Sequence, residues 1–383
     1  MKKIVLASAI SALFAAPATV LAQAKPPAAP TLDKVLEASG ITTSGYIDVG
    51  YTYANKNLEA GIAGGNPPNA ALRVFDNQNN SFALHQLGLT IAKQPKEGFG
   101  GLVNFTIGKD AQVIHSFPEN ASTQPTSMFD ITQAYMQYAS GSLTIIGGKF
   151  TTLHGTEVIA STGNTNVSRS ILFGAVPFTH TGLRATWALS DAVSLIAGVN
   201  NGWDQVTDQN RQKTAELGVT LAPIKPLSIT VSGYSGDEIS AVTGANGVRS
   251  TANVVASWAF TDAISVGLEY LTFSQDKAVA AGKAKYSGFA GYFTIMPTPK
   301  WRAVLRAEQF DDHDGFHFNT VGLAKPQTKY TEGTVTLAYL PADSFELRGE
   351  VRTDKADQAV FVQYDGTTSK TLMTVALQGL YKF

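Results

Sequence analysis

Charged side chains at every second position near the C-terminal end are the groups best able to do chemistry in this chain. They form two series, Arg302, Arg306 and Glu308, then Glu346, Arg348, Glu350 and Arg352. Apolar residues such as Leu305 and Val351 occupy positions between them. In a β-strand a period of two places all these charges on one face. Such ladders could pair internally, and they could also set the electric field in a water-filled passage.

The same parity argument assigns further charges to this polar face. Arg184 lies among Leu183, Ala185 and Trp187, and turning it toward lipid at mid-depth would cost about 2–4 kcal/mol. The remaining charges assigned to the face are Asp48, Glu216, Glu269, Glu332 and Lys382. A wall this polar needs water beside it, which favours an open channel over a filled interior. The alternative is ion pairing that only holds the strands in register, and the two roles are compatible.

Histidine and serine residues near the middle of the chain have the types used in nucleophilic catalysis. His154 and His180 flank a long connection that also contains Ser161, Ser168 and Ser170. Barrel enzymes of the outer membrane place such groups near the external rim, but spacing alone does not assemble a nucleophile, a base and an orienting group. We therefore expect that the protein is not an enzyme.

A metal site, a cofactor and a nucleic-acid partner are likewise not predicted. The run Asp311-Asp312-His313-Asp314, followed by His317, is more typical of a solvated loop than of a metal site. The formal net charge is −1, and the sequence has no basic stripe and no glycine-rich phosphate cradle between a strand and a helix.

The elements that must position the charge ladders are short strands with alternating apolar and polar residues. Sixteen such stretches, each close to the ~9–11 residues needed to cross a bilayer at a tilt, are expected near 45–53, 81–92, 99–109, 128–138, 143–150, 179–189, 192–201, 213–222, 227–235, 250–260, 263–273, 286–296, 300–310, 328–340, 344–353 and 370–383. The stretch 143–150 is the least regular, because Ile145 and Ile146 are adjacent and Lys149 falls on the lipid parity. Near the outer rim Lys149 could extend its ammonium group to water.

The connections alternate in length, as they do in bacterial barrels with short periplasmic turns and long external loops. Seven short links are rich in turn-forming residues, whereas long links include 54–80, 110–127, 151–178, 236–249, 311–327 and 354–369. Aromatic residues beside the short links, such as Trp258, Trp301 and Tyr339, are expected to form the periplasmic girdle; the alternative is the core of a soluble β-sandwich. We predict an all-β, transmembrane, antiparallel up-and-down barrel of sixteen strands, with fourteen or eighteen as alternatives.

Composition supports one barrel preceded by an export signal. Lys2 and Lys3, an apolar stretch from Ile4 to Leu21 and small residues up to Ala24 predict a cleaved signal peptide over residues 1–24. Residues 25–43 read as a Pro-rich periplasmic linker with a short helix, and residues 44–383 as the barrel. The chain has no Cys and 15% charged residues, and after the signal no apolar run approaches the ~20 residues of a spanning helix. A closed barrel is the common solution for such a membrane protein.

The C-terminal residues predict both shape and place. Met373, Val375, Leu377, Tyr381 and Phe383 share one parity, and the chain ends on an aromatic residue. This ending resembles the signal by which the barrel assembly machinery recognises outer-membrane barrels, with Tyr381 and Phe383 as the assembly-signal residues.

The segments around the third long link carry a family resemblance. They are Gly148-Lys149-Phe150, Gly155-Thr156-Glu157-Val158-Ile159, Asn164, Ser168-Arg169-Ser170 and Pro177-Phe178-Thr179-His180-Thr181-Gly182, together with Ser44-Gly45-Tyr46-Ile47-Asp48 and Gln133-Ala134-Tyr135. With them the mature chain resembles the β-barrel porin-2 family, also described as outer-membrane-protein-L-like porins. The resemblance implies a Gram-negative outer-membrane porin, in a family whose substrates are mostly undefined, and it makes a homotrimer plausible.

The third external loop has a counterpart in general porins, where it folds into the barrel and narrows it. By this analogy of architecture, Glu157 and Arg169 would stand at the constriction; alternatively both anchor the loop to the wall by ion pairs. We expect passive diffusion of small hydrophilic solutes and ions through a barrel surrounded by outer-membrane lipids. The alternative is a barrel plugged by its loops that acts as a receptor, adhesin or envelope anchor.

Overall fold

The computed structural model describes residues 31–59, 73–121, 127–318 and 327–383. The predicted signal peptide and the start of the predicted linker therefore lie outside the described residues. The helix α1 (Leu32–Ser39) is eight residues long. Among the described residues, no helix is long and apolar enough to cross a membrane.

Sixteen antiparallel strands close into one barrel, which confirms the predicted fold and strand number. The strands are β1 (Thr42–Ala54), β2 (Ser81–Lys93), β3 (Gly98–Ile107), β4 (Phe129–Ser140), β5 (Leu143–Thr151), β6 (Thr179–Ser190), β7 (Val193–Asn200), β8 (Thr214–Ile224), β9 (Leu227–Ile239), β10 (Asn246–Thr261), β11 (Ile264–Val279), β12 (Gly282–Thr298), β13 (Trp301–Asp312), β14 (Thr328–Ala342), β15 (Phe345–Ala356) and β18 (Thr371–Lys382).

Smaller elements lie in the long connections. The helices and 3₁₀ turns are α2 (Ala111–Ile114), η1 (Glu119–Ala121), η2 (Ser161–Gly163) and α3 (Ile171–Gly174). The last long connection holds a separate two-stranded pair, β16 (Phe361–Val362) and β17 (Thr368–Ser369).

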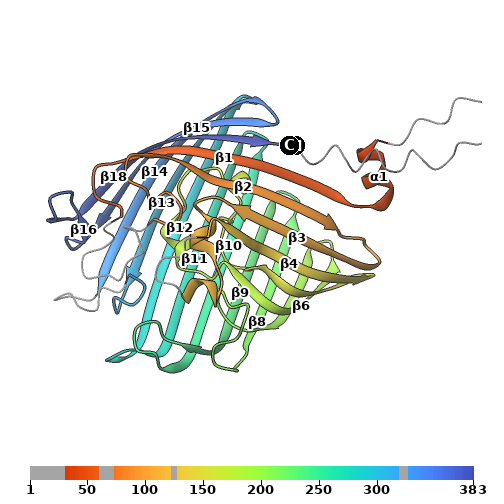
Figure 1. Cartoon of the computed structure of the whole chain (residues 1–383), viewed down its shortest axis with the longest axis horizontal. Coiled ribbons are helices and arrows are strands. Elements are labelled where there is room, and N and C mark those ends of the chain that lie inside the picture. The colour runs from red at the N-terminus through yellow and green to blue at the C-terminus, as the bar shows by residue number, and fades with distance from the viewer. Residues whose placement is uncertain (1–30, 60–72, 122–126, 319–326) are drawn as a thin grey trace, which may run out of the picture. The chain divides into compact units, whose positions relative to one another are not determined.

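The first and last strands pair with each other and close the ring. Their register runs from Tyr46 opposite Lys382 to Ala54 opposite Thr374. Gly45 and Phe383 exchange two backbone hydrogen bonds of 2.9 Å. In Figure 1 the red-orange β1 and the blue β18 lie next to each other at this seam. Closure leaves no unpaired strand edge, which a lipid environment requires.

Alternation along each strand separates a lipid-facing side from an inner side. On β15, Leu347 and Val351 are 46% and 48% exposed, whereas Arg348 and Arg352 are 2% and 0% exposed. Apolar side chains gain from lipid contact, and a charged side chain at mid-depth would lose hydration without gaining a partner. The exposed Trp301 packs against Tyr339 beside a short turn, with ring centres 4.8 Å apart.

Several strands extend further than the sequence pattern predicts. The strand expected at 263–273 continues to Val279, and the strand expected at 286–296 already begins at Gly282. Strands β11 and β12 therefore form one long hairpin. Lys277 and Gly282 have positive φ angles of 54° and 113°, which suit a tight reversal. Ala278 and Ala284 are buried in this hairpin. The shorter prediction was wrong there because residues 274–282 do not alternate in polarity.

Candidate functional site

The third loop, residues 152–178 between β5 and β6, crosses the interior of the barrel. Gly155 N donates to Asn253 Oδ1 on β10 at 3.0 Å, and Thr156 N donates to Glu269 Oε2 on β11 at 2.9 Å. Ser161 N donates to Gln86 Oε1 on β2 at 3.1 Å. Because β2 and β11 lie far apart in the strand order, one loop can reach both only by passing through the interior.

Two carboxylates of the inner wall hold the middle of this loop by its backbone. Glu308 on β13 accepts from the N–H groups of Ile171 and Leu172 at 2.8 and 2.6 Å. Glu350 on β15 accepts from the N–H groups of Val167 and Ser168 at 2.6 and 2.9 Å. Buried N–H groups need acceptors, and a charged acceptor makes a stronger hydrogen bond than a neutral one. We call these two interactions the carboxylate clamps.

Arg306 on β13 joins the loop to a neighbouring carboxylate of the wall. Its Nη1 donates to Glu157 Oε1 and to Ser168 O of the loop, both at 2.8 Å. Its Nε donates to Glu332 Oε2 on β14 at 3.1 Å. The Arg306 side chain is fully buried, so it depends on these partners for the hydrogen bonds that it would make to water.

The arginines of β15 hold loop carbonyl groups. Arg348 Nη1 donates to Asn166 O at 3.1 Å, and Arg352 Nη1 donates to Arg169 O at 2.5 Å. Arg352 also pairs with Asp354 on its own strand at 2.6 Å. The acidic side chains of the ladders therefore accept hydrogen bonds from loop N–H groups, and the basic side chains donate hydrogen bonds to loop carbonyl groups.

The twelve residues predicted to line a pore occupy the inner side of their strands. Eleven of them are at most 9% exposed: Asp48, Arg184, Glu216, Glu269, Arg306, Glu308, Glu332, Glu346, Arg348, Glu350 and Arg352. The Arg302 side chain is 12% exposed and pairs with Glu346. Lys382 is exposed at the end of β18. The third loop or neighbouring wall residues thus cover most of the charges that the sequence placed beside water.

Ion pairs on the other strands follow the same pattern. Arg184 binds Glu216 with both Nε and Nη2, and the Nη2 to Oε2 distance is 3.1 Å. Asp48 accepts from Gln378 Nε2 at 2.9 Å. Lys149 is buried, and its ammonium group lies 3.4 Å from Asp130 Oδ1.

The two predicted constriction residues both lie within packed parts of the loop. Glu157 accepts from Ser170 N at 2.6 Å in addition to its pair with Arg306. Arg169 is 1% exposed and donates to the carbonyl oxygens of Val158 and Ile159, both at 3.0 Å. In this geometry Glu157 binds the loop to Arg306 of the wall, and Arg169 stabilises the loop by hydrogen bonds to carbonyl groups of the loop itself.

The first external loop also reaches the interior, which sequence reasoning missed. Arg73 is buried and donates to Asp76 at 3.0 Å and to Asp354 on β15 at 2.9 Å. Phe75 packs against Phe173 of the third loop, with ring centres 5.7 Å apart. The Val74-Phe75 pair is a weak sequence signal, because the same connection also contains the apolar residues Leu58, Ile62 and Leu72.

A cavity of about 280 Å³ remains between the third loop and the wall of β1 and β3 to β5. Its wall side chains are Tyr46, Asn104, Thr106, Thr132, Gln133 and Thr151. The loop contributes residues 152–155 and 157–160, with Phe173, Pro177 and Phe178. The loop is clamped to β13 and β15 and also bonds to Gln86 on β2, and this cavity is a space that the loop leaves open beside the wall.

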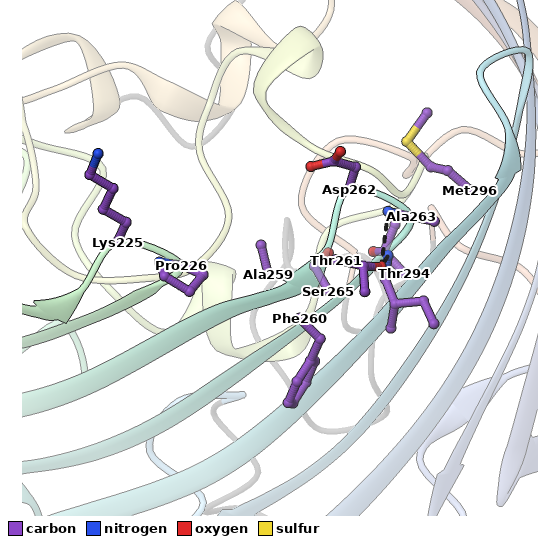
Figure 2. Close-up of a pocket in the computed structure, with 11 residues that line it drawn as sticks. Lys225, Pro226, Ala259, Phe260, Thr261, Asp262, Ala263, Ser265, Thr294 and Met296 are labelled. Atoms are coloured by element: carbon purple, nitrogen blue, oxygen red, sulfur yellow. Dashed lines mark hydrogen bonds between the residues drawn. The ribbon is translucent and has the colours of Figure 1, made fainter.

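Figure 2 shows a second hollow, of about 500 Å³, at the short-turn ends of β8 to β12. Lys225 and Asp262 come from adjacent short turns, and Phe260 and Met296 are among the other residues that line it. Most of its residues are exposed or half-buried. It lies away from the third loop and its clamps.

The histidine and serine residues do not form a catalytic arrangement in the structure. His154 Nδ1 lies 2.8 Å from Ser232 Oγ, and His180 Nδ1 lies 3.0 Å from Gly202 O. Both rings pack on Tyr234. Ser168 and Ser170 instead join the clamped part of the loop. Among the described residues, no three His, Cys, Asp or Glu side chains are grouped as for a metal ion.

Comparisons with known proteins agree with this architecture. The profile of the family described as "Putative beta-barrel porin-2, OmpL-like" matches residues 40–381. No curated protein matches the sequence. The solved outer-membrane channel DcaP of Acinetobacter baumannii is similar, with a TM-score of 0.60 and 14% identity, over 90% of this chain and 97% of that chain.

Two further solved structures share the fold. The anion-selective porin from Comamonas acidovorans has a TM-score of 0.63 and 11% identity, over 90% of this chain and 99% of that chain. OmpT of Vibrio cholerae, solved in a trimer form, has a TM-score of 0.59 and 10% identity, over the same shares. At these identities the structures show a common fold, whereas the family match covers nearly the whole chain. The chain therefore belongs to the family described as "Putative beta-barrel porin-2, OmpL-like", and it is an outer-membrane channel for the diffusion of solutes.

Proposed function

We propose that small hydrophilic solutes and ions cross the barrel through the space between the third loop and the wall of β1 and β3 to β5. The carboxylate clamps hold the loop against β13 and β15, and the 280 Å³ cavity lies on the other side of the loop. That cavity, lined by hydroxyl and amide side chains, is the observation that carries the proposal. No chemical step and no cofactor is part of it.

In this proposal the inner charges mainly hold the third loop in place, whereas the sequence pattern first suggested that they line the passage. Arg306 and Glu308 contact loop atoms, and Arg306 also pairs with Glu157 and Glu332. A paired ladder still shapes the field across a pore. We propose that the ladders mainly fix the width of the passage and contribute a weak charge preference.

Export and assembly complete the proposal. We propose that residues 1–24 are removed on export and that Tyr381 and Phe383 present the last strand to the barrel assembly machinery. A homotrimer is proposed because OmpT, a protein of the same fold, is described in a trimer form. Cross-linking of the purified protein in detergent, followed by native mass measurement, tests the trimer.

A second candidate function is favoured by the dense packing of the interior. A buried apolar cluster joins wall residues such as Phe310 and Tyr330 to Leu172 and Val176 of the third loop, and Arg73 brings in the first loop. If the loops close the barrel completely, the protein would act as a receptor, an adhesin or an envelope anchor.

Conductance of the refolded protein in a planar lipid bilayer separates the two candidates. A diffusion channel gives discrete steps that scale with the bulk salt concentration, whereas a closed barrel, shown to be folded and inserted, gives none. Gln133→Trp places an indole in the cavity and should lower the step size. Gln309→Trp is the matched control, because Gln309 is exposed on β13 between the inward-facing Glu308 and Phe310. Equal conductance of the two variants would contradict the proposed route.

A further inference from the structure

The barrel-wall side of the cavity beside the third loop is lined by neutral groups that form hydrogen bonds. The wall contributes the Tyr46 hydroxyl, the amides of Asn104 and Gln133, and the hydroxyl of Thr151. Tyr46 donates to Gln86 Oε1 at 2.5 Å, and Asn104 Nδ2 donates to Thr90 Oγ1 at 2.9 Å. These bonds fix the orientation of the side chains and leave the Asn104 Oδ1 acceptor for a ligand.

One charged residue lines this cavity in the described part of the chain, and it already has partners. Glu157 binds Arg306 and Ser170 N. His154 lines the cavity and is 3% exposed, and its Nε2 has no hydrogen-bond partner among the described residues. Burial lowers the pKa of His154 to about 3, so the ring is neutral near pH 7. An ionic solute would therefore meet no free opposite charge there, and the desolvation of an unpaired charge is costly.

The loop side of the cavity offers apolar surface. Phe173 and Phe178 pack together with ring centres 5.3 Å apart, and Leu153 and Val158 also contribute to the lining. A polar wall facing an apolar wall suits a molecule with hydroxyl groups on its rim and C–H groups on its faces. The volume of about 280 Å³ is near the lower end of the range of small-molecule sites, about 300–1,000 Å³.

We propose that this cavity is a binding site for a neutral polyhydroxylated solute of monosaccharide size, which occupies it during passage through the barrel. Hydroxyl groups both donate and accept, so they match amide, hydroxyl and imidazole partners in either direction. This inference deepens the proposed function and rests on it.

The test is the single-channel current of the full-length mature protein in a planar bilayer, with glucose as the probe. Glucose should interrupt the salt current in a saturable way. Gluconate, an acid with the same carbon skeleton, should not do so at equal concentration. Uninterrupted current in glucose, or equal interruption by gluconate, overturns the proposed site while the channel itself stands. Absence of any salt current would instead contradict the proposed function.

Substitutions locate the binding within the barrel. Gln133→Met removes one amide partner, so the half-saturating glucose concentration should rise about 5-fold, the equivalent of one net hydrogen bond. Asn104→Leu is a second variant with the same expected direction, should Gln133→Met not fold. Gln137→Met is the matched control, since Gln137 is on the same strand and face but outside the cavity lining. Equal half-saturation in all variants would place glucose elsewhere and overturn the inference.

Discussion

Replacing the clamp residue Glu350 by Gln should release the third loop from the inner wall. Glu350 accepts from the N–H groups of Val167 and Ser168 and from the Thr336 hydroxyl. Glutamine keeps the shape but puts an NH₂ group where one carboxylate oxygen was, so one loop N–H loses its acceptor. A hydrogen bond to a charged group contributes about 1.5–3 kcal/mol. We therefore expect loop opening to become about 10- to 150-fold more frequent.

Thiol labelling can measure this opening, because the chain contains no Cys. Val167 is 8% exposed, so Val167→Cys should react slowly with a small maleimide in the otherwise unchanged protein. When opening precedes labelling, the reaction rate follows the population of the open loop. Adding Glu350→Gln should therefore raise the labelling rate by the same 10- to 150-fold factor.

Two controls make this result specific. Glu216→Gln changes a carboxylate of the same inner wall that binds Arg184 and no loop N–H, so it should leave the Val167→Cys rate within about 2-fold. Val158→Cys lies on an exposed part of the loop and should label rapidly in every background. A Glu350→Gln rate equal to that of Glu216→Gln would refute the reasoning that carboxylates hold the loop.

Four further outcomes test other features. Arg306→Met should lower the free energy of unfolding by about 3–5 kcal/mol, measured by urea titration in detergent, because buried Glu157 loses its ion-pair partner and buried Glu332 keeps only the more distant Arg352. Leu337→Arg, on the lipid face of β14, should cost about 2–4 kcal/mol in bilayer refolding. Phe383→Ala should reduce the amount of assembled barrel in the outer membrane, measured by heat-modifiable mobility, and unchanged assembly would remove its role as a signal. Burial raises the pKa of Asp204 to about 6, above its ordinary value of ~3.9. The stability that this shift contributes is therefore present below about pH 4 and is lost as the pH rises to 6. Asp204→Asn should remove this part of the difference between the urea unfolding midpoints measured at pH 4 and at pH 7.

The strands of the barrel wall could be predicted closely from the sequence, because the surroundings of each side chain depend on its position within its own strand. Lipid on one side and polar groups on the other impose a period of two, so Leu347 and Arg348 could be assigned to opposite faces by position alone. Short turns with Pro, Asp and Ser mark the ends of hairpins. Prediction was poorer where this pattern is absent, as at the hairpin of β11 and β12, where Ala278, Val279 and Ala284 beside the tip pack against Phe316.

The contacts inside the barrel could not be predicted in the same way. The position of a residue along a strand shows whether its side chain points inward, but it does not show which groups that side chain contacts. Glu350 points inward in any barrel of this register, but its partners are backbone N–H groups of a loop about half the chain away. Every residue except proline has a backbone N–H group, so the sequence does not show which of these groups a carboxylate binds. The insertion of Arg73 had the same cause, since its partner Asp354 lies 281 positions later.

The closed seam between β1 and β18 constrains the order in which this molecule can assemble. The clamp partners of the third loop follow it by 137 positions for Glu308 and 183 for Glu350, so the carboxylate clamps cannot form until the last quarter of the chain is present. Contacts so distant in sequence form slowly. Once β18 pairs with β1 the wall has no lateral opening, so a loop that is still outside can enter only through the external end of the barrel. The pairing of the final strand thus separates two routes for the loop: insertion beside an incomplete wall before closure, and entry from the external end after it.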